Sequence, residues 1–179
     1  MNRPQTDAVE KAIGQAEALL EQMALMGYDP SDFGLDEFMP WLQVLTGREI
    51  QVVTRDLPFG LTGFWVIDGE FNYICCDAGH PPFFTEHVIT HESLHIFQSH
   101  IFPEHKTLDI GEQVIAEFLM RLAANRDIVP QIQSRPSITP GDDEIEWATI
   151  MIQASSRLRQ SPASSNKRVE EYIKITRLD

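Results

Sequence analysis

Residues 64–75 read FWVIDGEFNYIC and decide the fold class of this chain. Two apolar, strand-like runs flank Asp68 and Gly69, and an Asp-Gly pair supports the positive φ values of a type I′ turn. These residues therefore predict a β-hairpin. Just upstream, residues 50–54 are rich in β-branched side chains, which predicts one more short strand. Together the strands indicate a small antiparallel sheet.

Helical patterns lie on both sides of the predicted sheet. Apolar side chains recur three or four residues apart, and Gly27 and Gly47 are typical stop signals. On the first helix, the predicted core stripe is Val9, Ile13, Ala16, Leu20 and Met23. Helices are predicted over residues 6–26, 36–46, 85–100 and 109–125, a loop over 131–136, and a further helix opening at 139–142. The predicted fold class is α+β, with the sheet packed against helices.

The amino-acid composition makes some classes of binding partner unfavourable. The chain has 179 residues, with 27 acidic and 14 basic side chains and a formal net charge of −13. This excess of acids disfavours binding to nucleic acid or to an anionic membrane surface, because both attract Lys and Arg. No apolar run approaches the roughly 20 residues that a membrane helix needs, and no apolar signal core opens the sequence. We therefore expect a cytoplasmic protein without nucleic-acid or membrane partners.

The string His91-Glu92-Ser93-Leu94-His95 is the informative motif, and it lies inside a predicted helix. Residues four apart project from one face of a helix, so the two imidazoles can bind the same Zn²⁺ ion. Glu92 follows the first histidine and can take a proton from a water that the metal activates. This HExxH pattern therefore predicts a zinc site with His91 and His95 as ligands and Glu92 as catalytic base.

A catalytic zinc site needs a third protein ligand, and two glutamates on the next predicted helix are candidates. Glu117 lies mid-helix among apolar residues, where a lone charge is costly; a metal would remove that cost, and so would an ion pair with Arg121. Glu112 has the spacing of a capping box with Asp109. We predict Glu117 as the third ligand and keep Glu112 as the alternative.

The remaining histidines and the two cysteines are weaker candidates. His87 lies four residues before His91, and we interpret it as a solvated side chain, with contact to substrate or oxyanion as the alternative. His80, His100 and His105 have no assigned role. Cys75 and Cys76 are adjacent, so they neither cross-link the fold nor form a Cys-x-x-Cys site. We expect them at the end of a buried strand, with a regulatory thiol as the alternative.

The order of these parts resembles the ImmA/IrrE family of zinc metallopeptidases over residues 50–130. The similarity covers the approach to the hairpin, its second strand, the entry to the HExxH helix and the following helix. These are residues 57–64, 72–75, 84–92 and 116–125. The resemblance implies a gluzincin-type site, with His91, His95 and Glu117 as zinc ligands and Glu92 as general base. It also implies a regulatory protein as substrate.

We therefore predict a zinc-dependent metallopeptidase that hydrolyses a peptide bond in a protein or peptide substrate. The alternative is a regulatory or binding module that holds zinc with little or no proteolysis. We expect a single domain over residues 1–179, with N-terminal helices at 1–47, a catalytic core at 48–130 and a C-terminal helical extension at 131–179. The sequence does not indicate an oligomeric state.

Overall fold

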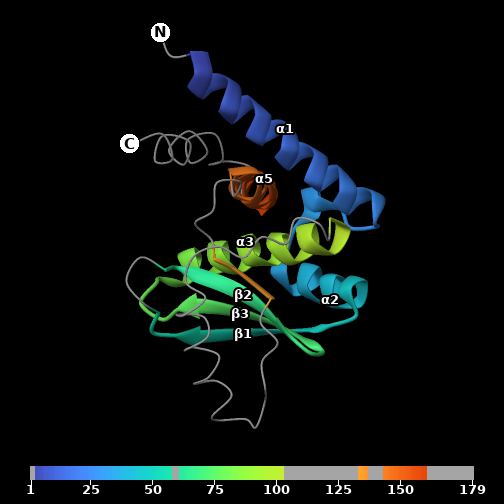
Figure 1. The fold of residues 1–179 in the computed structure, drawn as a ribbon. Helices are drawn as coiled ribbons and strands as arrows, with labels where there is room; N and C mark the ends of the chain where they lie inside the picture. The colour runs from blue at the N-terminus through green and yellow to red at the C-terminus, as the bar shows by residue number, and fades with distance from the viewer. Residues whose placement is uncertain (1–2, 58–60, 103–132, 137–142, 161–179) are drawn as a thin grey trace.

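The computed structural model describes residues 3–57, 61–102, 133–136 and 143–160 (Figure 1). Its helices are α1 (Arg3–Leu25), α2 (Leu35–Thr46), α3 (Pro82–Ile101) and α5 (Asp143–Gln160), with a short 3-10 turn η1 at Pro30–Asp32. Its strands are β1 (Glu49–Arg55), β2 (Gly63–Asp68), β3 (Phe71–Asp77) and β4 (Gln133–Pro136). These elements confirm the predicted α+β class.

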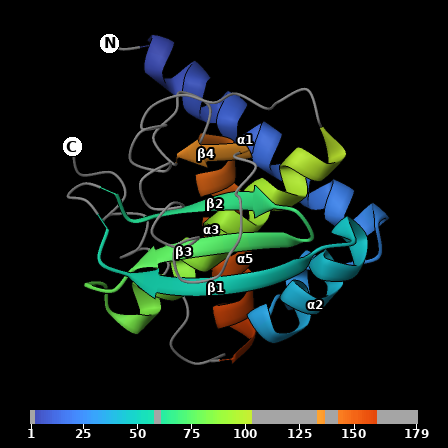
Figure 2. The same ribbon diagram turned by 60° about the horizontal axis from the view of Figure 1, so that its bottom comes forward.

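The predicted hairpin is β2 and β3, which pair antiparallel with Trp65 opposite Ile74. Gly69 has φ 55° in the turn, a value that glycine adopts without the steric cost of a side chain. The prediction of a wholly antiparallel sheet is wrong, however, because β1 pairs parallel with β3. The strand order is β1-β3-β2-β4, so β3 inserts between two strands that follow one another in sequence (Figure 2). The sheet is therefore mixed.

The predicted loop at residues 131–136 is also corrected, because part of it forms strand β4. This strand pairs antiparallel with β2 and ends with Pro136 opposite Phe64. Its residues Gln133–Pro136 show no alternation of apolar and polar side chains, so the local sequence carries no strand signal. Proline, which has no N–H to donate, is tolerated at an edge strand such as this. Pairing with a distant strand places these residues in the sheet.

The helices predicted around the sheet are confirmed within the described residues. Gly27 and Gly47 follow α1 and α2 with φ 89° and 67°, as the stop signals indicated. Pro40 lies inside α2 without ending it. Helix α3 begins at Pro82 and its last residue precedes Phe102. The helix predicted over residues 109–125 lies outside the described part of the chain, and so does the predicted opening of the last helix at 139–142.

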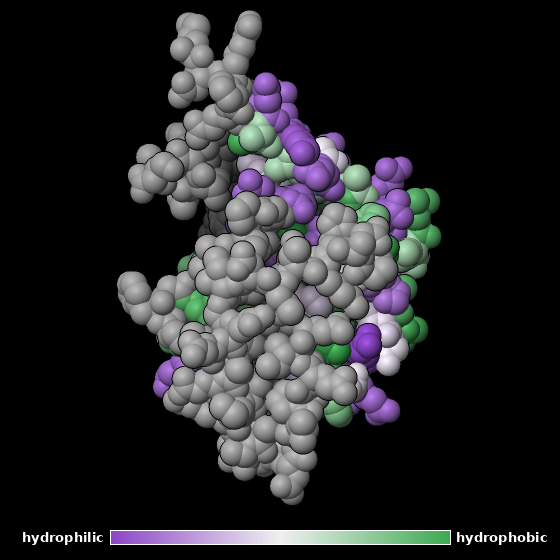
Figure 3. Space-filling view, in the orientation of Figure 1, coloured by the Kyte–Doolittle hydropathy of each residue, from purple (hydrophilic) through white to green (hydrophobic). Residues whose placement is uncertain are grey.

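The buried stripe of α1 includes Ala16 and Met23, as predicted, but is otherwise shifted from the predicted one. Its buried residues are Ala12, Ala16, Leu19 and Met23, whereas Val9 is 42% exposed. Other apolar side chains are exposed where α1 ends and on α2; they are Leu25, Met26 and Val44. Figure 3 shows hydrophobic residues along one edge of the molecule. Apolar spacing predicted the helix correctly, but the position of α5, against which α1 packs, determines which side is buried.

Helix α3 lies between the sheet and α5, which is the feature that positions the site (Figure 1). One side of α3 contacts β2 and β3, α5 lies against another side, and α2 contacts it through the Trp41–Phe97 ring pair. As a result, α3 is buried at Val88 and at every position from Thr90 to Gln98. The HExxH helix is therefore the central helix of the described fold, although many of its residues are polar.

We predict that Gly63→Ala destabilises the fold, because Gly63 is where β2 approaches α3 most closely. A Cβ atom there would collide with the Val88 side chain and lie 2.9 Å from the Cys75 carbonyl oxygen. Overpacking of this kind costs about 1–3 kcal/mol in the free energy of unfolding. Urea denaturation measures it, with Gly14→Ala as the matched control, since a Cβ on helical Gly14 meets no atom within 4 Å. Equal stability of the two variants would contradict the close approach.

Candidate metal centre

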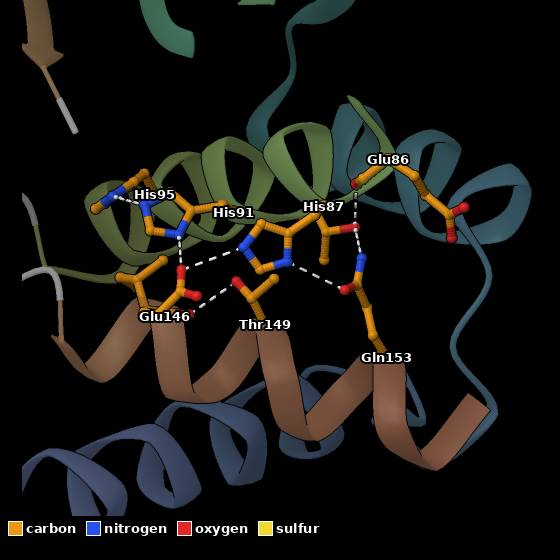
Figure 4. Close-up of polar contacts among 9 residues, drawn as sticks. Glu86, His87, His91, His95, Glu146, Thr149 and Gln153 are labelled. Atoms are coloured by element: carbon orange, nitrogen blue, oxygen red, sulfur yellow. Dashed lines mark hydrogen bonds and ion pairs between the residues drawn. The ribbon is translucent and has the colours of Figure 1, made fainter. Parts of the chain in front are cut away.

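Helix α3 brings the two predicted ligands together. The Nε2 atoms of His91 and His95 lie 3.1 Å apart, and the rings meet edge to face with centroids 4.7 Å apart. Both residues are buried, at 8% and 2% exposure. The spacing of the motif predicted that both imidazoles share a face of the helix, and the structure confirms this placement (Figure 4).

The separation of these two nitrogens fits one zinc ion. In a tetrahedral site with Zn–N distances of about 2.0–2.1 Å, two ligand nitrogens are about 3.3 Å apart. The observed 3.1 Å is close to this value, so both rings can bind the same ion with little movement. Neutral imidazole is also a donor that zinc favours. The histidine pair therefore fits the predicted metal in both geometry and chemistry.

The third ligand is not located. Glu117 and Glu112 both lie outside the described residues, so the choice between them stays a prediction. Within the described ranges, no group of three or more His, Cys, Asp or Glu side chains is arranged to hold a metal. The described part of the chain thus contributes two of the three predicted ligands.

Zinc affinity can decide between the two candidate glutamates. Glu117→Gln should weaken zinc binding far more than Glu112→Gln, because the first removes a ligand and the second only a helix cap. Loss of the cap costs about 0.5–2 kcal/mol of stability and leaves the donor set intact. Chelator competition on the two full-length variants measures zinc affinity. Their thermal midpoints measure the stability lost with the helix cap. The reverse ranking of affinities would assign the ligand to Glu112.

Glu92 is almost wholly buried on α3, at 1% exposure. It lies near strand β3, close enough for its charge to act on the thiol of Cys76. Burial, together with the smaller effect of the Glu92 charge, raises the pKa of Cys76 to about 12. Glu92 thus lies next to the histidine pair on the same helix and is buried.

The two cysteines lie in β3, as predicted, and both are buried. Burial raises the pKa of Cys75 above that of an ordinary thiol, and Cys76, Glu92 and Arg55 act on it more weakly. A thiol must ionise to act as a nucleophile, so burial makes both residues unreactive at neutral pH. The structure favours the structural interpretation over the regulatory thiol.

Glu146 on α5 is a site residue that the sequence analysis missed. Its Oε2 atom lies 3.3 Å from Nδ1 of His91 and 3.3 Å from Nε2 of His87 (Figure 4). Burial alone raises the pKa of Glu146, but the contacts with both histidines outweigh it and lower the pKa to about 2. The carboxylate is therefore ionised at neutral pH. In sequence, Glu146 reads only as one of three acids in a first helical turn, where the helix dipole accounts for them.

His87 belongs to the same cluster, and its interpretation as a solvated side chain is wrong. The side chain is 13% exposed and lies between α3 and α5. Its Nδ1 atom is 3.2 Å from Oε1 of Gln153, and its Nε2 atom faces Glu146. Helix α5 covers this side of α3, which the local sequence around His87 does not reveal. The alternative role of His87, contact with substrate or oxyanion, stays a prediction.

The other two described histidines, His80 and His100, are not part of this cluster. Nε2 of His80 lies 3.8 Å from Oδ2 of Asp77, and the His80 ring contacts the ring of Phe84. His100 is exposed in the last turn of α3. His105 lies outside the described residues.

Comparisons of this chain with protein-family models, with curated proteins and with solved structures found no match. Among the described residues, no helix is both long and apolar enough to cross a membrane. Inference about function therefore rests on the residues of the site.

Proposed function

We propose that this chain is a zinc-dependent metallopeptidase of the ImmA/IrrE type, which hydrolyses a peptide bond in a protein substrate in the cytoplasm. The 3.1 Å convergence of the His91 and His95 Nε2 atoms carries the proposal. A buried carboxylate directly beside this pair supports it, because HExxH hydrolysis needs a base that is not a ligand. We propose a regulatory protein as the substrate class, as the family resemblance implies.

His91 and His95 would hold the ion together with Glu117, or with Glu112 in its place. When bound, zinc lowers the pKa of water from about 15.7 to about 7 and polarises a carbonyl group. Glu92 is one residue from His91, which is about 100° around the helix axis. Its side chain therefore projects from a face of the helix next to the one that carries the two histidines. Its carboxylate takes the proton of the attacking water and passes it to the leaving amine.

A second candidate function is a regulatory or binding module that holds zinc and cleaves little. The burial of the histidine pair favours it, since both imidazoles are at most 8% exposed. Structural zinc sites are closed, whereas catalytic ones keep an open position for water and substrate. Zinc content is the same for both functions, so only cleavage distinguishes them.

The test begins with the full-length protein purified without chelator. Elemental analysis should find one zinc per chain. The zinc-loaded protein is then incubated with regulatory proteins encoded by neighbouring genes, with chelator-treated and zinc-reloaded samples in parallel. Cleavage that is lost on chelation and restored by zinc supports the peptidase. Zinc without cleavage supports the binding module, and a protein without zinc contradicts both.

A further inference from the structure

We propose that Glu146 is a positioning residue for the metal centre: from α5 it orients the His91 imidazole so that Nε2 is directed at the metal, while His87 holds Glu146 in place. This inference rests on the proposed zinc function and adds a second helix to the site. It assigns a role to a cluster of polar side chains that the peptidase chemistry does not otherwise use.

The two ring nitrogens of His91 face different partners. Nε2 faces the Nε2 atom of His95 at 3.1 Å, and Nδ1 faces the carboxylate of Glu146 at 3.3 Å (Figure 4). A carboxylate accepts hydrogen bonds only, so it favours the tautomer with the proton on Nδ1. In that tautomer Nε2 has its lone pair available for a metal. Histidine ligands of zinc commonly donate their other N–H to a carboxylate, which fixes the orientation of the ring.

Glu146 is itself held by a chain of polar contacts between α3 and α5. The same Oε2 atom contacts His87 Nε2, and His87 Nδ1 lies 3.2 Å from Gln153 Oε1. The amide of Gln153 donates to the Thr90 hydroxyl oxygen at 3.2 Å, and that hydroxyl donates to the main-chain oxygen of Glu86 at 2.9 Å. The Thr90 hydroxyl thus accepts from Gln153, which turns the amide oxygen toward His87. These contacts link Glu146, through His87 and Gln153, to the main chain of α3.

Glu146 is placed to orient a ligand rather than to be one. It contacts Nδ1 of His91, which is not the nitrogen that faces His95. Nor do the His91, His95 and Glu146 side chains form a group arranged to hold a metal in the described structure. An ionised carboxylate behind the ring also increases the electron density of the imidazole, so it strengthens the bond to the metal.

The test compares Glu146→Gln with Glu144→Gln in the full-length protein. Glu144 is a matched control because it lies on the same helix and contacts α3 as well, through an Oε1 atom 3.2 Å from Gln98 Nε2. Chelator competition measures zinc affinity, and the thermal midpoint of the zinc-stripped protein measures stability alone. Glu146→Gln should bind zinc about 10–100-fold more weakly than wild type, the usual effect of losing such a partner. Glu144→Gln should bind zinc like wild type, with a similar thermal midpoint in the stripped form.

A second measurement does not depend on how well a variant folds. Imidazole ¹⁵N NMR of the zinc-loaded wild type should show His91 bound through Nε2, with its proton on Nδ1. Binding of the metal through Nδ1 would overturn the inference. So would unchanged zinc affinity in Glu146→Gln, or an equal loss in both variants; in these cases the wild type still binds zinc and the proposed function is unaffected. A wild type without zinc would overturn the proposed function and this inference with it.

Discussion

Glu92→Gln should abolish peptide cleavage while the protein keeps its zinc and its fold. Glutamine has the size of glutamate but cannot accept the proton of the attacking water. Loss of proton transfer alone costs about 10²–10⁴-fold in rate. Zinc content should not change, because Glu92 is predicted to be the base and not a ligand. The fold should also tolerate the change, since it removes a charge from a position that is only 1% exposed.

The matched control for this variant is Glu86→Gln, an identical change at an exposed position of the same helix. Zinc stoichiometry, thermal midpoint and cleavage rate are measured side by side for wild type and both variants. The control should match wild type in all three. Cleavage by Glu92→Gln at the wild-type rate would show that Glu92 is not the base. Loss of zinc from Glu92→Gln would show that it helps to hold the metal.

His95→Ala should lose most of its zinc, and the double variant His91→Ala/His95→Ala should lose all of it. Wild type should contain one zinc per chain. The large effect follows from the geometry, because the two Nε2 atoms 3.1 Å apart are two of the three predicted protein ligands. A zinc ion left with one protein ligand dissociates during purification. Elemental analysis of the purified proteins measures the loss directly.

His100→Ala is the control for the histidine variants. His100 lies on the same helix, but it is exposed in the last turn and away from the pair. This variant should keep one zinc per chain, which separates loss of a ligand from a general effect of removing a histidine. Full zinc occupancy in the double variant would exclude the HExxH pair as the metal site.

The parts of the fold that were predicted correctly are formed by residues close to one another in sequence. The hairpin follows from the Asp-Gly pair and the runs on either side of it, and all of these residues lie within 64–75. The parallel pairing of β1 and the strand β4 depend instead on partners that are distant in sequence. Residues 133–136 become a strand only because β2 presents an edge to them. The sequence of residues 133–136 contains no pattern that predicts pairing with the edge of β2.

The same division holds within the candidate site. His91 and His95 are four residues apart on one helix, so their convergence could be predicted from helix geometry alone. Glu146 reaches His91 from another helix, 55 positions further along the chain. The burial of His87 could not be predicted for the same reason, because its partners Glu146 and Gln153 are also on α5. The packing of α5 on α3 is a tertiary contact between segments distant in sequence. No local pattern in a single sequence predicts it.

The separation of these partners along the chain has a consequence for the order of events during synthesis. Residues 82–101 leave the ribosome well before residues 143–160, so α3 is complete while α5 is still to be made. During that interval the HExxH helix can pack on the sheet, but the contacts of His87 and His91 with α5 cannot form. The contacts of these two imidazoles with Glu146 form only after residue 146 has emerged, and the contact of His87 with Gln153 spans 66 residues. The nascent chain therefore passes through a stage in which the histidine pair exists and its orienting carboxylate does not.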